Sequence, residues 1–204
     1  MSTTGLAALG IGSAVLSGLG FAPYVRAILR GHTRPERASW WIWLVLTLVA
    51  LTAQIAAGAT WSLLLTATYF VGDLVIALLS LRYGYGRFTA KDILSLVAAG
   101  CGVLLWKLTN DPLIALVGAI AVDFLGNCLT LEKSWRAPYT ENLVTWILIS
   151  IAAILGVLSV GSLNVTRLIF PLFILVINWV TALTIVYRRH WRKQRILAGQ
   201  RAAR

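Results

Sequence analysis

Apolar runs of membrane-spanning length follow one another along nearly the whole chain. A bilayer core needs about 20 mostly apolar residues per helix. Short polar or glycine breaks separate seven stretches of this kind, at residues 5–29, 40–58, 61–82, 91–108, 112–131, 142–160 and 166–187. A soluble domain of 204 residues could not bury so much apolar surface, since 59% of the residues are hydrophobic and only 12% are charged. We therefore predict an all-α integral membrane protein with seven transmembrane helices.

Lysine and arginine are distributed unevenly between the two sides that seven spans define. One side carries sixteen of them, and the other carries only Lys107 and Arg167. The positive-inside rule then predicts a multi-pass protein of the cell membrane, with its N-terminus outside and its C-terminus in the cytoplasm. This placement also accounts for the net charge of +11 without a nucleic-acid partner. Residues 189–204 are predicted to form a basic cytoplasmic tail that binds anionic lipid.

The same proline–tryptophan pair, with the same spacing, occurs twice in the chain, 103 residues apart. Pro35 is followed by Trp43, and Pro138 is followed by Trp146, in each case eight residues later. A repeat at this distance predicts a doubled three-helix unit. With one helix inserted between the triplets, the copies are parallel repeats: residues 1–84, a linker helix 4 within 85–110, and residues 111–188. Doubled membrane units commonly place a binding site between the copies.

Motifs at the end of the first span carry a family resemblance. The span ends in Pro23-Tyr24, a basic stretch follows, and Ser39 precedes the second span. This resembles the SWEET and PQ-loop superfamily, in which a Pro-Gln dipeptide is followed by a basic stretch and a serine. The resemblance implies parallel three-helix repeats around a central site, small-solute transport, and a hinge at Pro23.

The chain departs from the family pattern at several positions. Tyr24 stands where the family has glutamine, and Gly126-Asn127 stands where the second copy would have Pro-Gln. SWEET sugar transporters carry an asparagine midway along helices 3 and 7. Asn178 keeps this residue, but the corresponding position on helix 3 is Asp73. The carboxylate argues against a plain sugar carrier.

Ionisable and polar residues lie halfway along several spans. Such groups are costly at membrane depth and usually face protein or water, so we predict that they line one shared pocket. The predicted substrate-binding residues are Asp73, Asp123, Asn127, Asn178, Tyr69, Trp146 and Trp179. For Ser13, Ser17, Thr47 and Thr66, we expect only hydrogen bonds to neighbouring helices. Because no lysine or arginine lies at the depth of the two aspartates, three explanations stay open: a bound proton, a cationic substrate or a bound ion.

Two functions from different classes fit these patterns. The first is a small-solute transporter that uses alternating access around a midplane site, and the second is a receptor or sensor of SWEET-like fold that binds without translocation. The chain has no recognisable catalytic triad, metal-ligand spacing or Cys-x-x-Cys, so an enzyme, a cofactor and a metal site are not expected. Cys101 and Cys128 are expected to be small buried hydrophobes. A homo-oligomer is left open.

Tryptophan is abundant, and several of the tryptophans lie near span ends. Trp40, Trp41, Trp43, Trp61 and Trp106 occupy such positions. Tryptophan is enriched at membrane–water interfaces, where its ring is apolar and its N–H is hydrated. We therefore expect these five residues to form an aromatic belt.

Overall fold

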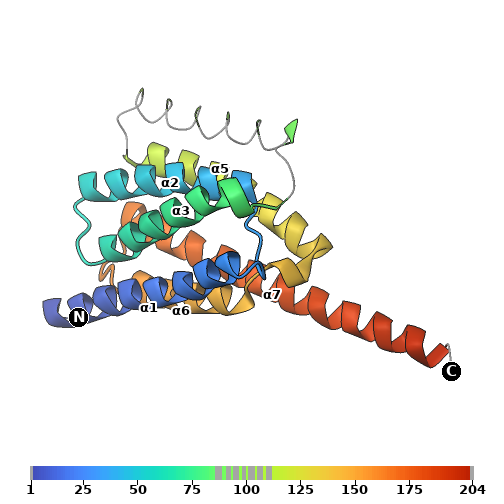
Figure 1. Cartoon of the computed structure of the whole chain (residues 1–204). Coiled ribbons are helices and arrows are strands. Elements are labelled where there is room, and N and C mark those ends of the chain that lie inside the picture. Colours follow the sequence, from blue (N-terminus) through green and yellow to red (C-terminus); the bar gives the residue numbers. More distant parts are fainter. Residues whose placement is uncertain are drawn as a thin grey trace.

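The computed structural model describes residues 2–85, 89–90, 93, 97, 100, 104, 108 and 112–202. Within this part the chain is all-helical apart from its loops (Figure 1). The helices are α1 (Thr3–Leu29), α2 (Arg37–Ala56), α3 (Leu63–Tyr83), α5 (Pro112–Arg136), α6 (Leu143–Leu158) and α7 (Val165–Ala202), with a 3₁₀ turn η1 at Pro138–Thr140. The helical fold class is confirmed. The predicted linker helix, residues 91–108, lies largely outside the described residues.

Four of the described helices are long and apolar enough to cross a membrane. They are α1, α2, α3 and the part of α7 from Arg167 to Arg195, and α6 is a shorter apolar helix of 16 residues. These lengths and compositions support a membrane protein. The arrangement as seven spans in two repeats is taken up under Proposed function.

Helix ends coincide with polar caps and glycines, which explains why the predicted boundaries were close. Side chains of Ser2, Glu36, Asn142 and Asn164 accept hydrogen bonds from backbone N–H groups in the first turns of α1, α2, α6 and α7. Glycines with positive φ follow α1, α2 and α6, namely Gly31 (74°), Gly58 (71°) and Gly161 (66°). A residue with a Cβ would be strained in this conformation, so glycine is suited to end each helix.

The end of α7 differs from the prediction. The hydropathy pattern predicts a span that ends at residue 187 and a separate tail, but α7 continues as one helix to Ala202 and projects beyond the rest of the bundle (Figure 1). Apolar character ends at Tyr187, whereas no proline follows it, and most of residues 188–202 are Arg, Lys, Gln, Leu or Ala, which have high helix propensity. A hydropathy window marks where lipid ends, which is a different boundary from the end of the helix.

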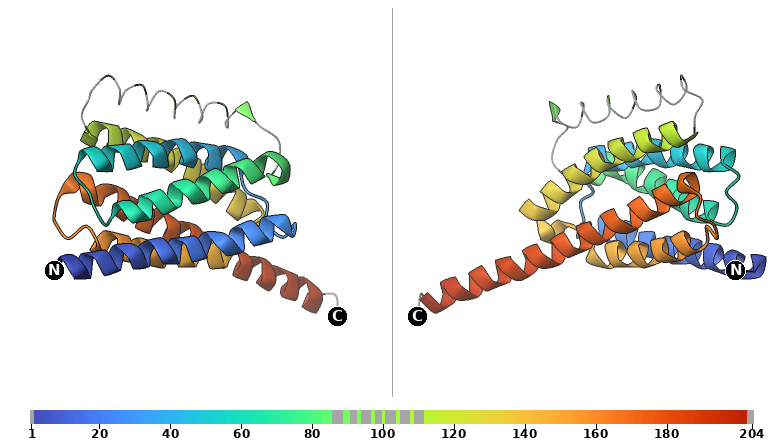
Figure 2. Two further views of the ribbon diagram at one scale, coloured as in Figure 1. Left: turned by 60° about the vertical axis from the view of Figure 1, so that its left-hand side comes forward. Right: turned by 180° about the vertical axis from the view of Figure 1, so that it is seen from behind.

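The described helices form a closed ring. Their main contacts join α1 to α3, α3 to α2, α2 to α5, α5 to α7, α7 to α6, and α6 back to α1 (Figure 2). Each helix therefore packs mainly against two neighbours, and the interior of the ring receives side chains from all six.

One end of the ring is basic and the other is not. The loops after α1 and α5 meet at the basic end, where the backbone N–H of Arg34 donates to the carbonyl of Thr140 (3.2 Å). At the opposite end, Nε of Arg167 donates to the carbonyl of Ala57 (3.1 Å). It follows that α1, α3, α5 and α7 run towards the basic end, and that α2 and α6 run away from it.

The two cysteines were expected to be buried. Cys128 is instead exposed on the outer face of α5 as a free thiol. It follows Asn127 directly, and a step of 100° around the helix turns it out of the ring. Cys101 lies outside the described residues.

Candidate functional site

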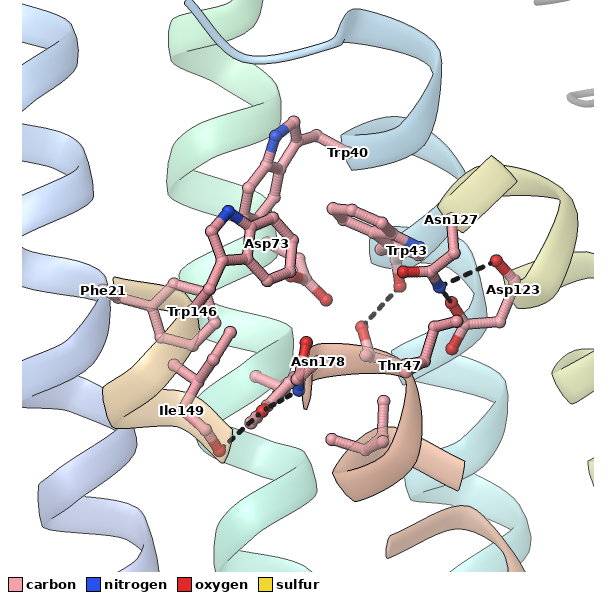
Figure 3. Close-up of a pocket in the computed structure, with 13 residues that line it drawn as sticks. Phe21, Trp40, Trp43, Thr47, Asp73, Asp123, Asn127, Trp146, Ile149 and Asn178 are labelled. Carbon is pink, nitrogen blue, oxygen red and sulfur yellow. Dashed lines mark hydrogen bonds between the residues drawn. The ribbon is translucent and has the colours of Figure 1, made fainter. Parts of the chain in front are cut away.

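A cavity lies inside the ring, and all six described helices contribute to its wall (Figure 3). Its volume is about 30 Å³, which is room for one or two water molecules. The lining residues are Phe21, Trp40, Trp43, Thr47, Tyr69, Asp73, Asp123, Asn127, Trp146, Ile149, Ile174, Ile177 and Asn178. In this conformation the cavity is therefore small.

The structure brings six of the seven predicted binding residues to this cavity. They are Asp73, Asp123, Asn127, Asn178, Tyr69 and Trp146, and each is at least 94% buried. Their shared location agrees with the predicted pocket, while their role in binding stays a prediction. Trp179 is not among the lining residues, and its side chain is 37% exposed. Trp179 lies 100° around α7 from Asn178, on the side away from the cavity, whereas Ile177 on the other side of Asn178 also lines the cavity.

Asp123 and Asn127 form a local pair on α5. The Asn127 side-chain amide donates to the Asp123 carboxylate (2.7 Å) and also to the Asp123 backbone carbonyl (3.0 Å). Residues four apart lie on one face of a helix, so the sequence spacing is sufficient to create this contact. The Asp123 carboxylate therefore has a hydrogen-bond donor on its own helix.

Tyr69 connects three helices across the cavity. Its hydroxyl donates to the carbonyl of Ile149 on α6 (3.3 Å) and accepts from the side-chain amide of Asn178 on α7 (2.9 Å) (Figure 3). This chain of hydrogen bonds links α3 of the first triplet to α6 and α7 of the second. It fixes the orientation of both polar side chains.

Asp73 is the least satisfied polar residue of the cavity wall. Its side chain is 2% exposed, and its Oδ2 atom has no hydrogen-bond partner among the described residues. Thr47 faces it, but the Thr47 hydroxyl donates to the carbonyl of Trp43 (2.8 Å). A buried carboxylate oxygen without a partner is energetically costly, which is typical of an atom that binds something else in another state.

Aromatic rings form much of the remaining wall. Phe21 packs edge-to-face against Tyr69, with ring centroids 5.4 Å apart. Trp40 packs in the same way against Trp43 (4.9 Å), and Trp43 against Trp146 (6.0 Å). Edge-to-face contacts place neighbouring rings roughly perpendicular, so that the wall resembles a box rather than a stack.

A layer of polar contacts covers the cavity at the basic end. The carboxylate of Glu141 accepts hydrogen bonds from the Tyr24 hydroxyl (3.1 Å) and from the indole N–H of Trp146 (3.0 Å). It also forms a buried ion pair with Lys133, whose ammonium group donates to the backbone carbonyl of Arg34. Glu141 therefore connects α1, α5 and α6 directly above the tryptophans.

Two further contacts in this layer cross between the triplets. The Asn142 side-chain amide donates to the carbonyl of Pro23 (3.0 Å), and the Ser39 hydroxyl donates to the carbonyl of Gly126 (2.7 Å). Pro23 and Gly126 lie 103 residues apart, the offset of the predicted repeat. Thus the backbone carbonyls at both positions accept a hydrogen bond from a residue distant in the sequence. A hinge at Pro23 stays a prediction.

Several lining residues were missed because of their positions near a span end. Trp40 and Trp43 were expected in an interfacial belt. Thr47 was expected only to form a hydrogen bond to a neighbouring helix, but its hydroxyl donates to carbonyls of its own helix. Both tryptophans are instead buried, with 2% and 7% exposure, so the belt prediction is wrong for them. The first turns of α2 are packed between α3 and α5, and their tryptophan side chains face the interior of the ring. Positions 40, 43, 47 and 54 all lie on one face of α2, and this spacing was the available signal.

The cavity offers carboxylate, amide and hydroxyl groups among aromatic rings. Within the described part of the chain, no cluster of three His, Cys, Asp or Glu residues could hold a metal ion. The arrangement is therefore suited to holding a small polar molecule by hydrogen bonds, charge and ring contacts. Comparisons of the chain with family models, with curated proteins and with solved structures give no match.

Proposed function

We propose that the chain is a membrane transporter that carries a small solute by alternating access. In this proposal α1–α3 and α5–α7 are the two halves, and their relative rocking exposes the central cavity to one side of the membrane at a time. The observation that carries the proposal is the cavity itself. It lies midway along the helices, is lined from both halves, and contains two buried carboxylates.

A two-fold internal correspondence supports the assignment of two halves. A shift of 103 residues takes α1, α2 and α3 to α5, α6 and α7. Under this shift each helix contact has a counterpart: α1 with α3 corresponds to α5 with α7, α2 with α3 to α6 with α7, and α1 with α6 to α5 with α2. The corresponding helices also run in the same direction, as parallel repeats require.

The two ends of the middle segment support a crossing between the halves. Tyr85 lies at the basic end, where its backbone N–H donates to the carbonyl of Pro35 (2.7 Å). Pro112 begins α5, which runs towards the basic end and therefore starts at the other one. We propose that residues 85–110 supply a seventh span, which gives the 3+1+3 arrangement of the SWEET and PQ-loop superfamily. With the positive-inside rule, the N-terminus is then outside and the C-terminus is cytoplasmic.

Closure at the basic end favours a gated pathway over a static pocket. The hydrogen bonds from Tyr24 to Glu141, from Asn142 to Pro23 and from Ser39 to Gly126 all join the two halves. Three further hydrogen bonds join the halves here, from Arg34 to Thr140, from Lys133 to Arg34 and from Thr130 to Ser39. Separation of the halves at this end breaks all six. Membrane-embedded side-chain hydrogen bonds contribute about 0.6–2 kcal/mol each, an amount that a substrate can offset.

Accessibility of the cavity from the two sides tests this proposal independently of the cargo. Cysteine is introduced at Thr47 or Ile174 in a background in which Cys101 and Cys128 are serine. A membrane-impermeant thiol reagent is then applied to whole cells and to inside-out vesicles. We expect labelling of each site from both sides. A cysteine at Val15, on the exposed face of α1, is the control and should remain unlabelled from both.

The alternative function gives a different result. If both cavity cysteines are labelled from one side only, under all conditions, the protein is a receptor or sensor and not a carrier. A thermal-shift screen over sugars, amino acids, amines and vitamins, followed by liposome uptake of each hit, then identifies the ligand. Stabilisation without uptake would favour the receptor function.

A further inference from the structure

The polar groups of the cavity are unequally engaged, and this inequality restricts what the cavity can bind. Asn127, Tyr69 and Thr47 direct their donors to acceptors within the protein, and Asn178 directs one N–H to Tyr69. The indole N–H of Trp43 is a buried donor that has no hydrogen-bond partner among the described residues. Among the acceptors, Asp73 Oδ2 is buried and has no hydrogen-bond partner among the described residues. A ligand that enters this cavity therefore meets an unpartnered acceptor on Asp73 and an unpartnered donor on Trp43, and the Trp43 donor already faces Asp123.

The two carboxylates differ in their surroundings. Asp123 receives the Asn127 amide, and the indole N–H of Trp43 also faces it, although without a hydrogen bond of acceptable geometry. Asp73 has only the Thr47 hydroxyl in front of it, and the hydrogen of that group is used elsewhere. Of the two, Asp73 is consequently the carboxylate that remains open to a ligand.

No positive side chain of the cavity wall balances these carboxylates. The thirteen lining residues include no lysine, arginine or histidine. Lys133 lies beyond the tryptophans at the basic end, where it pairs with Glu141. Since an unbalanced charge at membrane depth is strongly unfavourable, each carboxylate needs either a bound proton or a positive ligand.

The aromatic wall suits the same kind of ligand. Phe21, Trp40, Trp43, Tyr69 and Trp146 all line the cavity, and successive rings meet edge to face. Perpendicular rings around a common space are the arrangement by which proteins bind ammonium groups through cation–π attraction, and tryptophan is the best ring for it. An anion would face two carboxylates that no lining cation balances, so the wall disfavours it.

We propose that the cargo is a small organic cation whose ammonium group binds to Asp73 within the aromatic box. This proposal rests on the transport function proposed above and names its substrate class. A volume of about 30 Å³ matches an ammonium group with few substituents. The remainder of a larger amine enters only when the two halves move apart.

Pairs of cationic and neutral molecules of the same shape test the proposal. The probes are ethanolamine with ethylene glycol, choline with 3,3-dimethylbutan-1-ol, and benzylamine with benzyl alcohol. Binding to the purified full chain in nanodiscs is measured by thermal shift and by calorimetry. We expect at least one cation to bind at least tenfold more tightly than its neutral partner. Equal binding within every pair, or no binding of any amine, overturns the proposal.

Variants of α3 assign the binding to Asp73. Asp73→Asn should weaken binding of the preferred cation at least tenfold. Thr66→Val is the matched control, since Thr66 is buried on the same helix outside the cavity, and it should bind as the wild type does. If Asp73→Asn does not fold, Asp73→Glu replaces it and should alter the order of preference among the three amines. Unchanged affinity in Asp73→Asn, or an unchanged order in Asp73→Glu, counts against the assignment.

Uptake into proteoliposomes separates this proposal from the transport function. Binding of a cation through Asp73 without uptake would support the proposed ligand class and refute the transport function. Uptake of a neutral solute that is not inhibited by any amine would support the transport function and refute the proposed ligand class.

Discussion

The indole rings of Trp43 and Trp146 meet edge to face in the middle of the bundle, with centroids 6.0 Å apart and an interplanar angle of 77°. The two residues lie 103 residues apart, on α2 and α6, at equivalent positions of the proposed repeat. Both line the cavity, and Trp146 is tied to the Glu141 carboxylate at the basic end. The contact therefore joins the halves at the point where the cavity is closed.

Removal of the Trp146 hydrogen bond should weaken this closure. Trp146→Phe keeps an aromatic ring but loses the N–H that donates to Glu141 (3.0 Å). We expect a loss of about 1 kcal/mol, because Glu141 retains two other partners. Thermal unfolding in detergent measures it. Trp179→Phe is the control on the half-exposed face of α7 and should change the midpoint little; an equal loss in both variants would contradict the role of the hydrogen bond.

The buried ion pair between Lys133 and Glu141 should behave differently from an exposed one. Both side chains are at most 2% exposed. Lys133→Met leaves the carboxylate buried without its cation, and we expect a loss of about 3–5 kcal/mol. Lys133→Met with Glu141→Gln should recover much of it, since glutamine is neutral and still offers an oxygen to Tyr24. Thermal or denaturant unfolding of the single and double variants measures the coupling.

An exposed ion pair on the same helix serves as the control for the variants of Lys133 and Glu141. Arg136 and Glu132 pair one turn apart, with side chains 72% and 41% exposed. Removal of this pair should cost less than about 0.5 kcal/mol. If the double variant at the buried pair is no more stable than Lys133→Met alone, then burial of an uncompensated charge is not the source of the loss.

The length and polarity of the helices were predictable because they depend on local properties. Transfer free energies of neighbouring residues add along a span, and caps such as Asn142 and glycines such as Gly161 act within one turn. The same locality explains why Asp73, Asp123 and Asn178 could be identified. A charged or polar residue in an apolar run must face inward, whatever its neighbours are.

What remained hidden depends on contacts between distant segments. Lys133 lies just beyond the predicted end of its span at residue 131, where a lysine is expected to face water, whereas the fold buries it against Glu141. Trp40 and Trp43 were predicted to lie at the membrane interface because they are near a span end, but both side chains are buried in the interior of the ring. The order of helices around the ring follows from such tertiary contacts, and no local pattern encodes it.

Gly72 should be far less tolerant of alanine than Gly118. A Cβ at Gly72 would lie 2.6–2.7 Å from atoms of the Phe21 ring, which is itself packed against Tyr69 and Trp40. We expect Gly72→Ala to cost about 1–3 kcal/mol, because a helix or a ring must shift. Gly118→Ala meets nothing within 4 Å and should be neutral or stabilising by up to about 1 kcal/mol. Unfolding midpoints of the two variants provide the comparison.

The two termini should lie on opposite sides of the membrane. Six described helices alone would return the chain to its starting side, so this result depends on a crossing by the segment between Tyr85 and Pro112. A reporter active only outside the cytoplasm, fused at either end, measures the arrangement. We expect activity at the N-terminus and none at the C-terminus; termini on one side would remove the linker span and the parallel repeats.

The projecting end of α7 should bind anionic lipid through charge. Cations and rings alternate along it: Arg188 lies over the rings of Trp135 (4.3 Å) and Trp191 (4.6 Å), and Arg195 also lies over Trp191 (4.6 Å). Trp135 and Trp191 are 49% and 37% exposed, and amphipathic rings of this kind reside at headgroup level.

Each basic residue near an anionic surface contributes about 1 kcal/mol of attraction. The variant Arg192→Gln, Lys193→Gln, Arg195→Gln should therefore lose most of the extra thermal stability that phosphatidylglycerol gives over phosphatidylcholine. Arg192→Lys with Arg195→Lys keeps the charge and should retain it. If the lysine variant loses the effect as well, planar contacts of arginine with Trp191 and phosphate decide the binding, because lysine acts as a point charge and cannot reproduce them.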